Sequence, residues 1–139
     1  MLVDTSGLLA ALFPDQRHHQ ACAEVLRTAR PPLVLSPFVL AELDYLIARH
    51  AGVEAELEML AEVAREAYRL AEFSAADVEE ARAVVEEFRD LEVGLADASL
   101  VVLSRRHRTL DLLTLDARHF RALRGAGDRA FHILPQLSL

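Results

Sequence analysis

Five short apolar segments, separated from one another by helical stretches, constrain the fold of this chain more than any other feature. They are residues 2–3, 33–35, 68–73, 112–115 and 131–134, and each is followed by a polar or turn-forming residue. Strands that alternate with helices form a parallel sheet covered on both faces. We therefore predict an α/β fold, namely an α/β/α sandwich with a short parallel sheet of four to five strands in which helix predominates.

Capping residues and prolines set the limits of the intervening helices. Ser36 before Pro37 is a favourable helix start, Ser74 with Asp77 three residues later is another, and Asp15 is expected to cap a third. The predicted helices cover residues 8–13, 15–29, 37–50, 54–67, 74–88, 95–107 and 117–124. No repeat or linker interrupts the pattern, so we predict a single domain over residues 1–139.

The compartment is predicted from what the sequence lacks. Cys22 is the only cysteine, so no internal disulfide can form, and it is interpreted as a packing residue. The chain has no basic leader before its first strand, and no apolar run approaches the ~20 residues of a membrane span. The expectation is a cytoplasmic protein without a membrane partner.

The absence of lysine excludes several classes of phosphate chemistry. All 15 basic residues are arginine. A P-loop nucleotide site requires its phosphate-binding lysine, and receiver-like and haloacid-dehalogenase-like phosphotransfer sites also rely on one. Any phosphate chemistry in this chain must therefore use arginine or a metal ion.

Charge is distributed unevenly. The 22 acidic and 15 basic residues give a net charge of −7. Residues 54–87 hold eleven acids against three arginines, whereas residues 98–139 hold seven arginines against three acids. The basic last third is the part of the chain suited to a polyanionic partner.

Four acids stand where a parallel sheet would bring them together. Ligands bind beyond the carboxyl ends of parallel strands. The acids that follow the predicted strands, or lie early in the helices after them, are Asp4, Glu42, Asp97 and Asp116. Taken one by one, Asp4 and Asp116 could be helix caps, and Glu42 and Asp97 could favour helix dipoles.

The apolar surroundings of two of these acids argue for a cation. Asp97 is the only charged residue between Glu92 and Arg105, and Glu42 lies in the apolar segment 38–43. Buried unpaired carboxylates are unfavourable, and two of them ~4 Å apart repel by ~4 kcal/mol at an effective dielectric of ~20. With only oxygen ligands expected, the cluster suits Mg²⁺ or Mn²⁺ rather than Zn²⁺.

At this point the sequence resembles a known family. The segments LVDTS (2–6), SPFVLAEL (36–43), GLADAS (94–99) and LTLDARHF (113–120) are similar, in order and spacing, to the four motifs of PIN-domain proteins. They resemble in particular the VapC-type toxins of bacterial toxin–antitoxin pairs. The similarity extends along nearly the whole chain and includes the ending FHILP at 131–135.

The resemblance implies a PIN-like sandwich and a metal-dependent endoribonuclease that leaves 5′-phosphate and 3′-hydroxyl ends. It assigns the catalytic set to Asp4, Glu42, Asp97, Asp116, Ser6 and Thr114. Asp4 and Asp97 are expected to bind the metal directly, and Asp116 directly or through water. Glu42 would bind through water or orient the nucleophile. The resemblance also implies an RNA substrate, a cognate VapB-type antitoxin and a homodimer.

Arginines must offset the negative charge near an RNA substrate. The main candidates for substrate binding are Arg105, Arg118 and Arg121, and further candidates are Arg106, Arg108 and Arg124. His119 follows the fourth acid and could touch substrate, although a surface position is the expectation. Two alternatives stay open: an inactive PIN scaffold that binds RNA or a protein, and a nuclease directed at DNA or at particular nucleic-acid structures.

Overall fold

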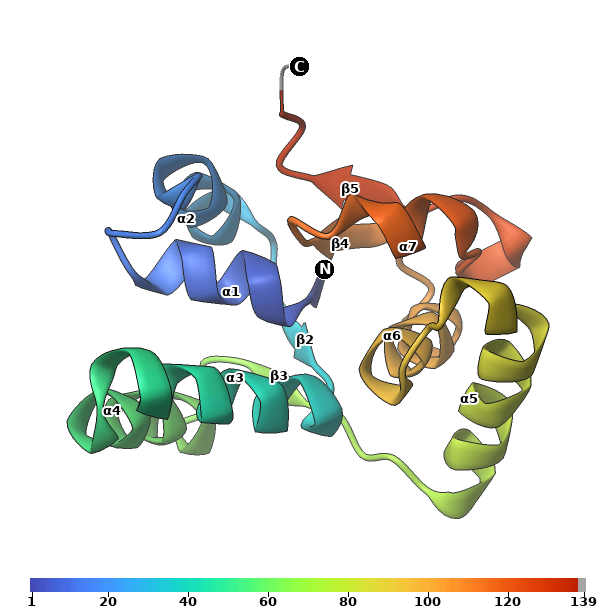
Figure 1. Cartoon of the computed structure of the whole chain (residues 1–139), viewed down its shortest axis with the longest axis horizontal. Coiled ribbons are helices and arrows are strands. Elements are labelled where there is room, and N and C mark those ends of the chain that lie inside the picture. Colours follow the sequence, from blue (N-terminus) through green and yellow to red (C-terminus); the bar gives the residue numbers. More distant parts are fainter. Residues whose placement is uncertain (138–139) are drawn as a thin grey trace.

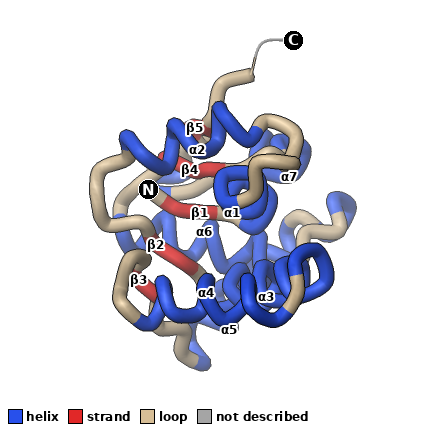
Figure 2. Tube along the Cα trace, turned by 90° about the vertical axis from the view of Figure 1, so that its left-hand side faces the viewer, coloured by secondary structure: helices blue, strands red, loops and turns tan. Residues whose placement is uncertain are grey.

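A five-stranded parallel sheet forms the centre of the molecule. The computed structural model describes residues 1–137. The strands are β1 (Leu2–Val3), β2 (Val34–Leu35), β3 (Arg69–Leu70), β4 (Asp111–Leu113) and β5 (His132–Leu134). They are arranged in the order β3-β2-β1-β4-β5, and every neighbouring pair is parallel (Figure 2). The predicted α/β class and the short sheet are confirmed.

Helices cover both faces of this sheet. Helices α1 (Thr5–Leu12), α2 (His19–Thr28), α3 (Pro37–Ala51) and α4 (Val53–Ala64) lie to one side of the strands in Figure 1. Helices α5 (Ala75–Glu87), α6 (Leu95–His107) and α7 (Ala117–Ala122) lie to the other. Two short 3₁₀ turns, Arg89–Leu91 and Ala126–Asp128, complete the second layer. Among residues 1–137, no helix combines the length and the apolar character that crossing a bilayer demands.

Local sequence accounts for most helix limits. The Ser36 hydroxyl accepts from the amide of Phe38 at the start of α3, and Ser74 and Asp77 form the predicted capping box of α5. The predicted cap at Asp15 is wrong. Helix α2 begins at His19, because Asp15 faces another part of the molecule and pairs with His50 at 3.1 Å.

The core lies between the sheet and the two helical layers. Both residues of β1 are fully buried, and seven consecutive residues of α6, 98–104, are buried as well. Gly7 lets α1 approach β4 closely, because a Cβ there would lie 2.6 Å from Leu113 Cγ and 2.8 Å from the Leu113 carbonyl oxygen. This approach brings the start of α1 against the carboxyl end of β4.

Candidate functional site

The four acids singled out in the sequence line one pocket at the carboxyl ends of the strands. Asp4 directly follows β1, and Asp116 follows β4 by three residues. Glu42 is contributed by α3 and Asp97 by the first turn of α6. All four line a cavity of about 420 Å³ together with Thr5 and Ser6.

Asp4 is the most deeply buried of these carboxylates, with 6% of its surface exposed. Burial is the main reason that its pKa rises from 3.8 to about 6, and the nearby charges of Asp97 and Glu42 raise it further. The Thr114 hydroxyl opposes the rise by donating to Asp4 Oδ2 at 2.7 Å. An ionised Asp4 is therefore a carboxylate whose environment favours an added cation.

A chain of hydroxyl groups holds Asp4 in place. The amide of Leu115 donates to Ser6 Oγ at 2.9 Å, and Ser6 Oγ lies 3.2 Å from Thr114 Oγ1. Thr114 Oγ1 also accepts from the amide of Asp116 at 3.0 Å. Because the Thr114 proton goes to Asp4, Ser6 is the donor in the hydroxyl pair. The buried hydroxyl of Thr114 thus joins the segments that carry Asp4 and Asp116.

Glu42 is oriented by a residue that sequence reasoning missed. Thr5 Oγ1 donates to Glu42 Oε1 at 2.8 Å, and Thr5 is buried. Two hydroxyl residues follow Asp4 in the sequence, and the family resemblance assigns a role only to Ser6. Since both hydroxyls lie in the first turn of α1, they point to different partners, Ser6 toward β4 and Thr5 toward α3.

His119 also has a role that differs from the expectation, because the predicted surface position is wrong. The residue is buried, with 9% of its surface exposed, and Nδ1 lies 2.7 Å from Asp97 Oδ2. Arg118 Nη2 lies 3.3 Å from His119 Nε2. Because a guanidinium can only donate, Nε2 accepts and the proton is on Nδ1, which donates to Asp97. Burial raises the pKa of Asp97, and this hydrogen bond opposes the rise.

The donor set fits a divalent cation. One ligand atom from each of Asp97, Asp116 and His119 lies within 4.8 Å of the other two. Both nitrogens of the His119 imidazole already have partners in Asp97 and Arg118, so the ligand atoms that remain for a cation are carboxylate oxygens. In the described part of the chain, neither Asp4 nor Asp116 caps its following helix with its side chain. Simple capping does not account for these two carboxylates.

Two buried serines fix the helices that carry Glu42 and Asp97. Ser36 and Ser99 are fully buried, and their hydroxyl oxygens are 2.7 Å apart. Ser99 donates to the carbonyl of Ala96 at 2.6 Å, which leaves Ser36 to donate to Ser99. The start of α3 is thereby tied to the first turn of α6.

The candidate arginines do not gather around the acids. Arg118 lies beside the site through His119, and Arg121 is exposed one turn further along α7. Arg105 is eight residues beyond Asp97 on α6, which places it ~12 Å away along the helix axis. The structure does not bring Arg105 to the acidic cavity.

The remaining candidate arginines have partners or positions of their own. Arg106 pairs with Asp77 at 2.5 Å and donates to the carbonyl of Glu72. Arg124 donates to carbonyl groups at the end of α7 and so caps that helix. Arg108 lies at the far end of α6 with Arg105.

Comparison with known proteins adds a family and a close relative. The family model described as PIN domain matches residues 1–126. Ribonuclease VapC26 of Mycobacterium tuberculosis (strain ATCC 25618 / H37Rv) is 46% identical over 135 residues, which cover 97% of this chain and all of the relative.

Two solved structures share the fold. The crystal structure of VapC20 of Mycobacterium tuberculosis, described as a sarcin-ricin loop cleaving toxin, superposes with a TM-score of 0.78 at 21% identity, over 84% of this chain and 90% of that one. A toxin–antitoxin complex from Klebsiella pneumoniae gives a TM-score of 0.66 at 21% identity, over 90% of this chain and 93% of that one.

Proposed function

The chain belongs to the PIN-domain family, and on that premise we propose that it is a metal-dependent endoribonuclease, the toxin of a VapC-type toxin–antitoxin pair. The observation that carries this proposal is the cavity lined by four carboxylates, in which burial raises the pKa of Asp4 to about 6. Its relative VapC26 is named a ribonuclease. Residues 1–139 would form a single PIN domain.

Asp4, Asp97 and Asp116 would hold Mg²⁺ or Mn²⁺. Carboxylate oxygens are the usual ligands of both ions. A divalent ion bound there would polarise a phosphate oxygen and lower the pKa of a bound water. His119 keeps Asp97 Oδ2 in position by donating to it, and Thr114 does the same for Asp4 Oδ2. Ser6 supports Thr114.

Glu42 is the group that we assign to the attacking water. Thr5 occupies Oε1, and no hydrogen bond among residues 1–137 engages Oε2. A carboxylate fixed through one oxygen can accept a hydrogen bond from water through the other and so orient it for in-line attack on phosphorus. The products would carry 5′-phosphate and 3′-hydroxyl ends.

The proposed substrate is RNA, and the proposed partners are a VapB-type antitoxin and a second copy of the chain. Arg118, exposed beside the cluster, is suited to a phosphate oxygen. The antitoxin proposal draws support from the Klebsiella pneumoniae complex, which contains toxin and antitoxin. The homodimer proposal draws support from exposed apolar side chains on α3 and α4, namely Tyr45, Leu46, Val53, Leu57 and Leu60.

Metal-dependent cleavage of RNA is the decisive experiment. Purified protein is mixed with structured RNA and with DNA of the same sequence, in Mg²⁺, Mn²⁺ or EDTA. We expect RNA to be cut with either metal, EDTA to stop the reaction, and Asp4→Asn and Asp97→Asn to lose at least two orders of magnitude in rate. Asp90→Asn, an exposed acid outside the cavity, is the matched control.

Each alternative has its own outcome in this assay. Cleavage of DNA in preference to RNA would identify a DNA-directed nuclease. Metal binding without turnover on any RNA would indicate an inactive scaffold. Folded Asp4→Asn and Asp97→Asn proteins that cut as fast as the parent would refute the site.

A further inference from the structure

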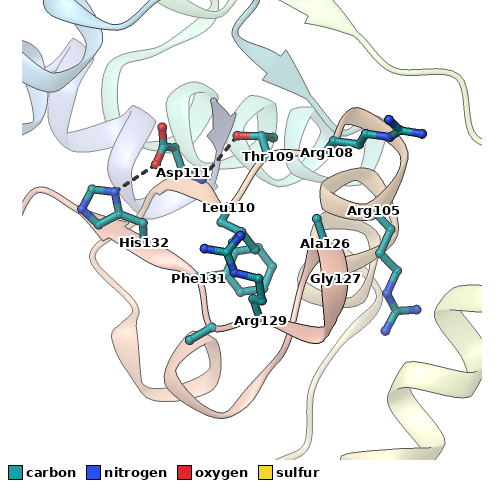
Figure 3. A pocket seen from close by; sticks show the side chains of 11 residues that line it. Arg105, Arg108, Thr109, Leu110, Asp111, Ala126, Gly127, Arg129, Phe131 and His132 are labelled. Atoms are coloured by element: carbon teal, nitrogen blue, oxygen red, sulfur yellow. Dashed lines mark hydrogen bonds and ion pairs between the residues drawn. The ribbon is translucent and has the colours of Figure 1, made fainter.

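A second pocket lies at the amino-terminal ends of strands β4 and β5, whereas the four acids lie at the carboxyl ends of the strands. Its volume is about 960 Å³, and it is formed by the end of α6, the starts of β4 and β5, and the 3₁₀ turn Ala126–Asp128. Figure 3 shows Arg129 in the middle of the view in front of Phe131, with Arg105 and Arg108 at the rim, pointing outward from the end of α6. The pocket therefore has the apolar side chains of Leu110 and Phe131 in its lining, one guanidinium group over Phe131 and two more at the rim.

Two of these guanidinium groups are available for a ligand. None of the ion pairs formed within residues 1–137 involves Arg108 or Arg129. Arg105 has only a long contact of 3.8 Å with Glu80. The acid at the pocket wall, Asp111, is bonded to His132 at 2.9 Å. The pocket thus carries positive charge in a protein whose net charge is −7.

The wall that carries Arg129 is held rigidly. Ser104 is fully buried, donates to the carbonyl of Thr109 at 2.6 Å and accepts from the amide of Ala126 at 2.9 Å. The amide of Gly125 donates to the carbonyl of Arg129 at 2.8 Å. A Cβ at Gly125 would lie 2.3 Å from Ser104 Oγ, so glycine is needed for this contact. The pocket is preorganised and does not depend on a loose loop.

Helix α7 connects the two sites. It begins directly after Asp116, beside the acidic cavity, and the chain then continues to Ala126, which lines the second pocket. Arg118 and Arg121 are exposed along this helix. Phosphate groups of a strand that leaves the cavity over α7 would meet these arginines before reaching the pocket.

We propose that the pocket of Arg105, Arg108 and Arg129 is a second binding site for the RNA substrate. It binds phosphate groups at a distance from the bond that is cleaved. Arginine binds phosphate through two parallel hydrogen bonds, and its plane also stacks on unpaired bases. This inference rests on the proposed function, since it places an extension of the same substrate. It means that affinity depends on RNA beyond the cleavage site.

The experiment measures binding as a function of RNA length. Fluorescence anisotropy is recorded for single-stranded RNA oligonucleotides of increasing length, with Asp116→Asn in every protein to prevent cleavage. The test variant is Arg108→Ala/Arg129→Ala. The charge-matched control is Arg17→Ala/Arg30→Ala, because both arginines are exposed and neither lines this pocket. Arg108→Lys/Arg129→Lys keeps the positive charge but cannot form the two parallel hydrogen bonds of a guanidinium group with phosphate.

We expect the affinity of the parent and of the control to rise with RNA length, and that of the test variant to rise less. The salt slope is the change in the logarithm of the binding constant with the logarithm of the salt concentration, and each phosphate contact in a single strand contributes about −0.7 to it. When the salt rises from 50 to 200 mM, the loss of affinity should therefore be about sevenfold smaller for the variant, which lacks two contacts, than for the parent. The lysine variant should keep the parental salt slope and bind more weakly.

Three results would overturn the inference. They are an equal gain with length in parent and test variant, an equal loss in the control, and binding of inorganic phosphate in calorimetry without any dependence on RNA length. The last would identify a simple anion pocket. Failure of every protein to bind any RNA would instead refute the proposed function.

Discussion

Replacing Asp4 by asparagine should stabilise the metal-free protein. The pKa of Asp4 is about 6 in the folded chain against 3.8 for an ordinary aspartate. Because the folded value is the higher one, protonated Asp4 favours folding below pH ~4, and this contribution is lost as the pH rises through about 6. A difference of about two units corresponds to about 3 kcal/mol. Asparagine avoids the buried charge and still accepts from Thr114.

The assay is urea unfolding of parent and Asp4→Asn in EDTA at pH 4, 6 and 8. The variant should be more stable by about 3 kcal/mol at pH 8, roughly 10 °C in melting temperature, and the difference should shrink toward pH 4. The other titrating groups contribute nearly equally to the free energy of unfolding of both proteins, so their contributions largely cancel in the difference. Saturating Mg²⁺ should stabilise the parent and leave the variant nearly unchanged, because the variant lacks one of the three proposed ligands.

Equal stability of the two proteins at pH 8 in EDTA would refute this reasoning. A stability difference that stays constant from pH 4 to pH 8 would do so as well, since it could not come from ionisation. Loss of folding in the variant would mean that Asp4 is needed for packing and not for its charge.

Three further predictions concern the support of the site. Thr114→Val removes the donor to Asp4 and the acceptor of two other groups, so the free energy of unfolding should fall by about 2 kcal/mol, as urea titration can measure. His119→Gln should weaken Mn²⁺ binding by about 10–100-fold in calorimetry, whereas a surface residue would have no effect. Gly7→Ala should destabilise the protein by roughly 1–3 kcal/mol in thermal unfolding, since its Cβ would clash with Leu113, and a wild-type melting temperature would contradict the close approach.

The sequence carried enough information for the sheet and for the position of the four acids. Short apolar strands and their order are local patterns, and the carboxyl ends of parallel strands meet at one edge whatever the details of packing. The sequence predicts the helix that carries Asp97 with the limits that α6 has in the structure, because its apolar run is long and ends at a cluster of basic residues.

His119 and Asp15 show where local patterns stop being informative. Whether His119 faces Asp97 or solvent depends on how the short helix α7 is rotated against α6, and six residues carry too little periodicity to set that rotation. The local sequence predicts a helix cap at Asp15, but in the structure Asp15 pairs with His50, 35 positions away. In both cases a tertiary contact overrides a reasonable local preference.

The hydrogen bond between Thr114 and Asp4 has a consequence for the synthesis of the protein. It joins residues 110 positions apart, so this part of the site cannot exist until most of the chain has emerged from the ribosome. A nascent chain that has been made as far as residue 110 contains Asp4, Glu42 and Asp97 but lacks β4, the strand that aligns Asp4. The proposed site is therefore completed only when β4 pairs with β1, which is a late step in the synthesis of the chain.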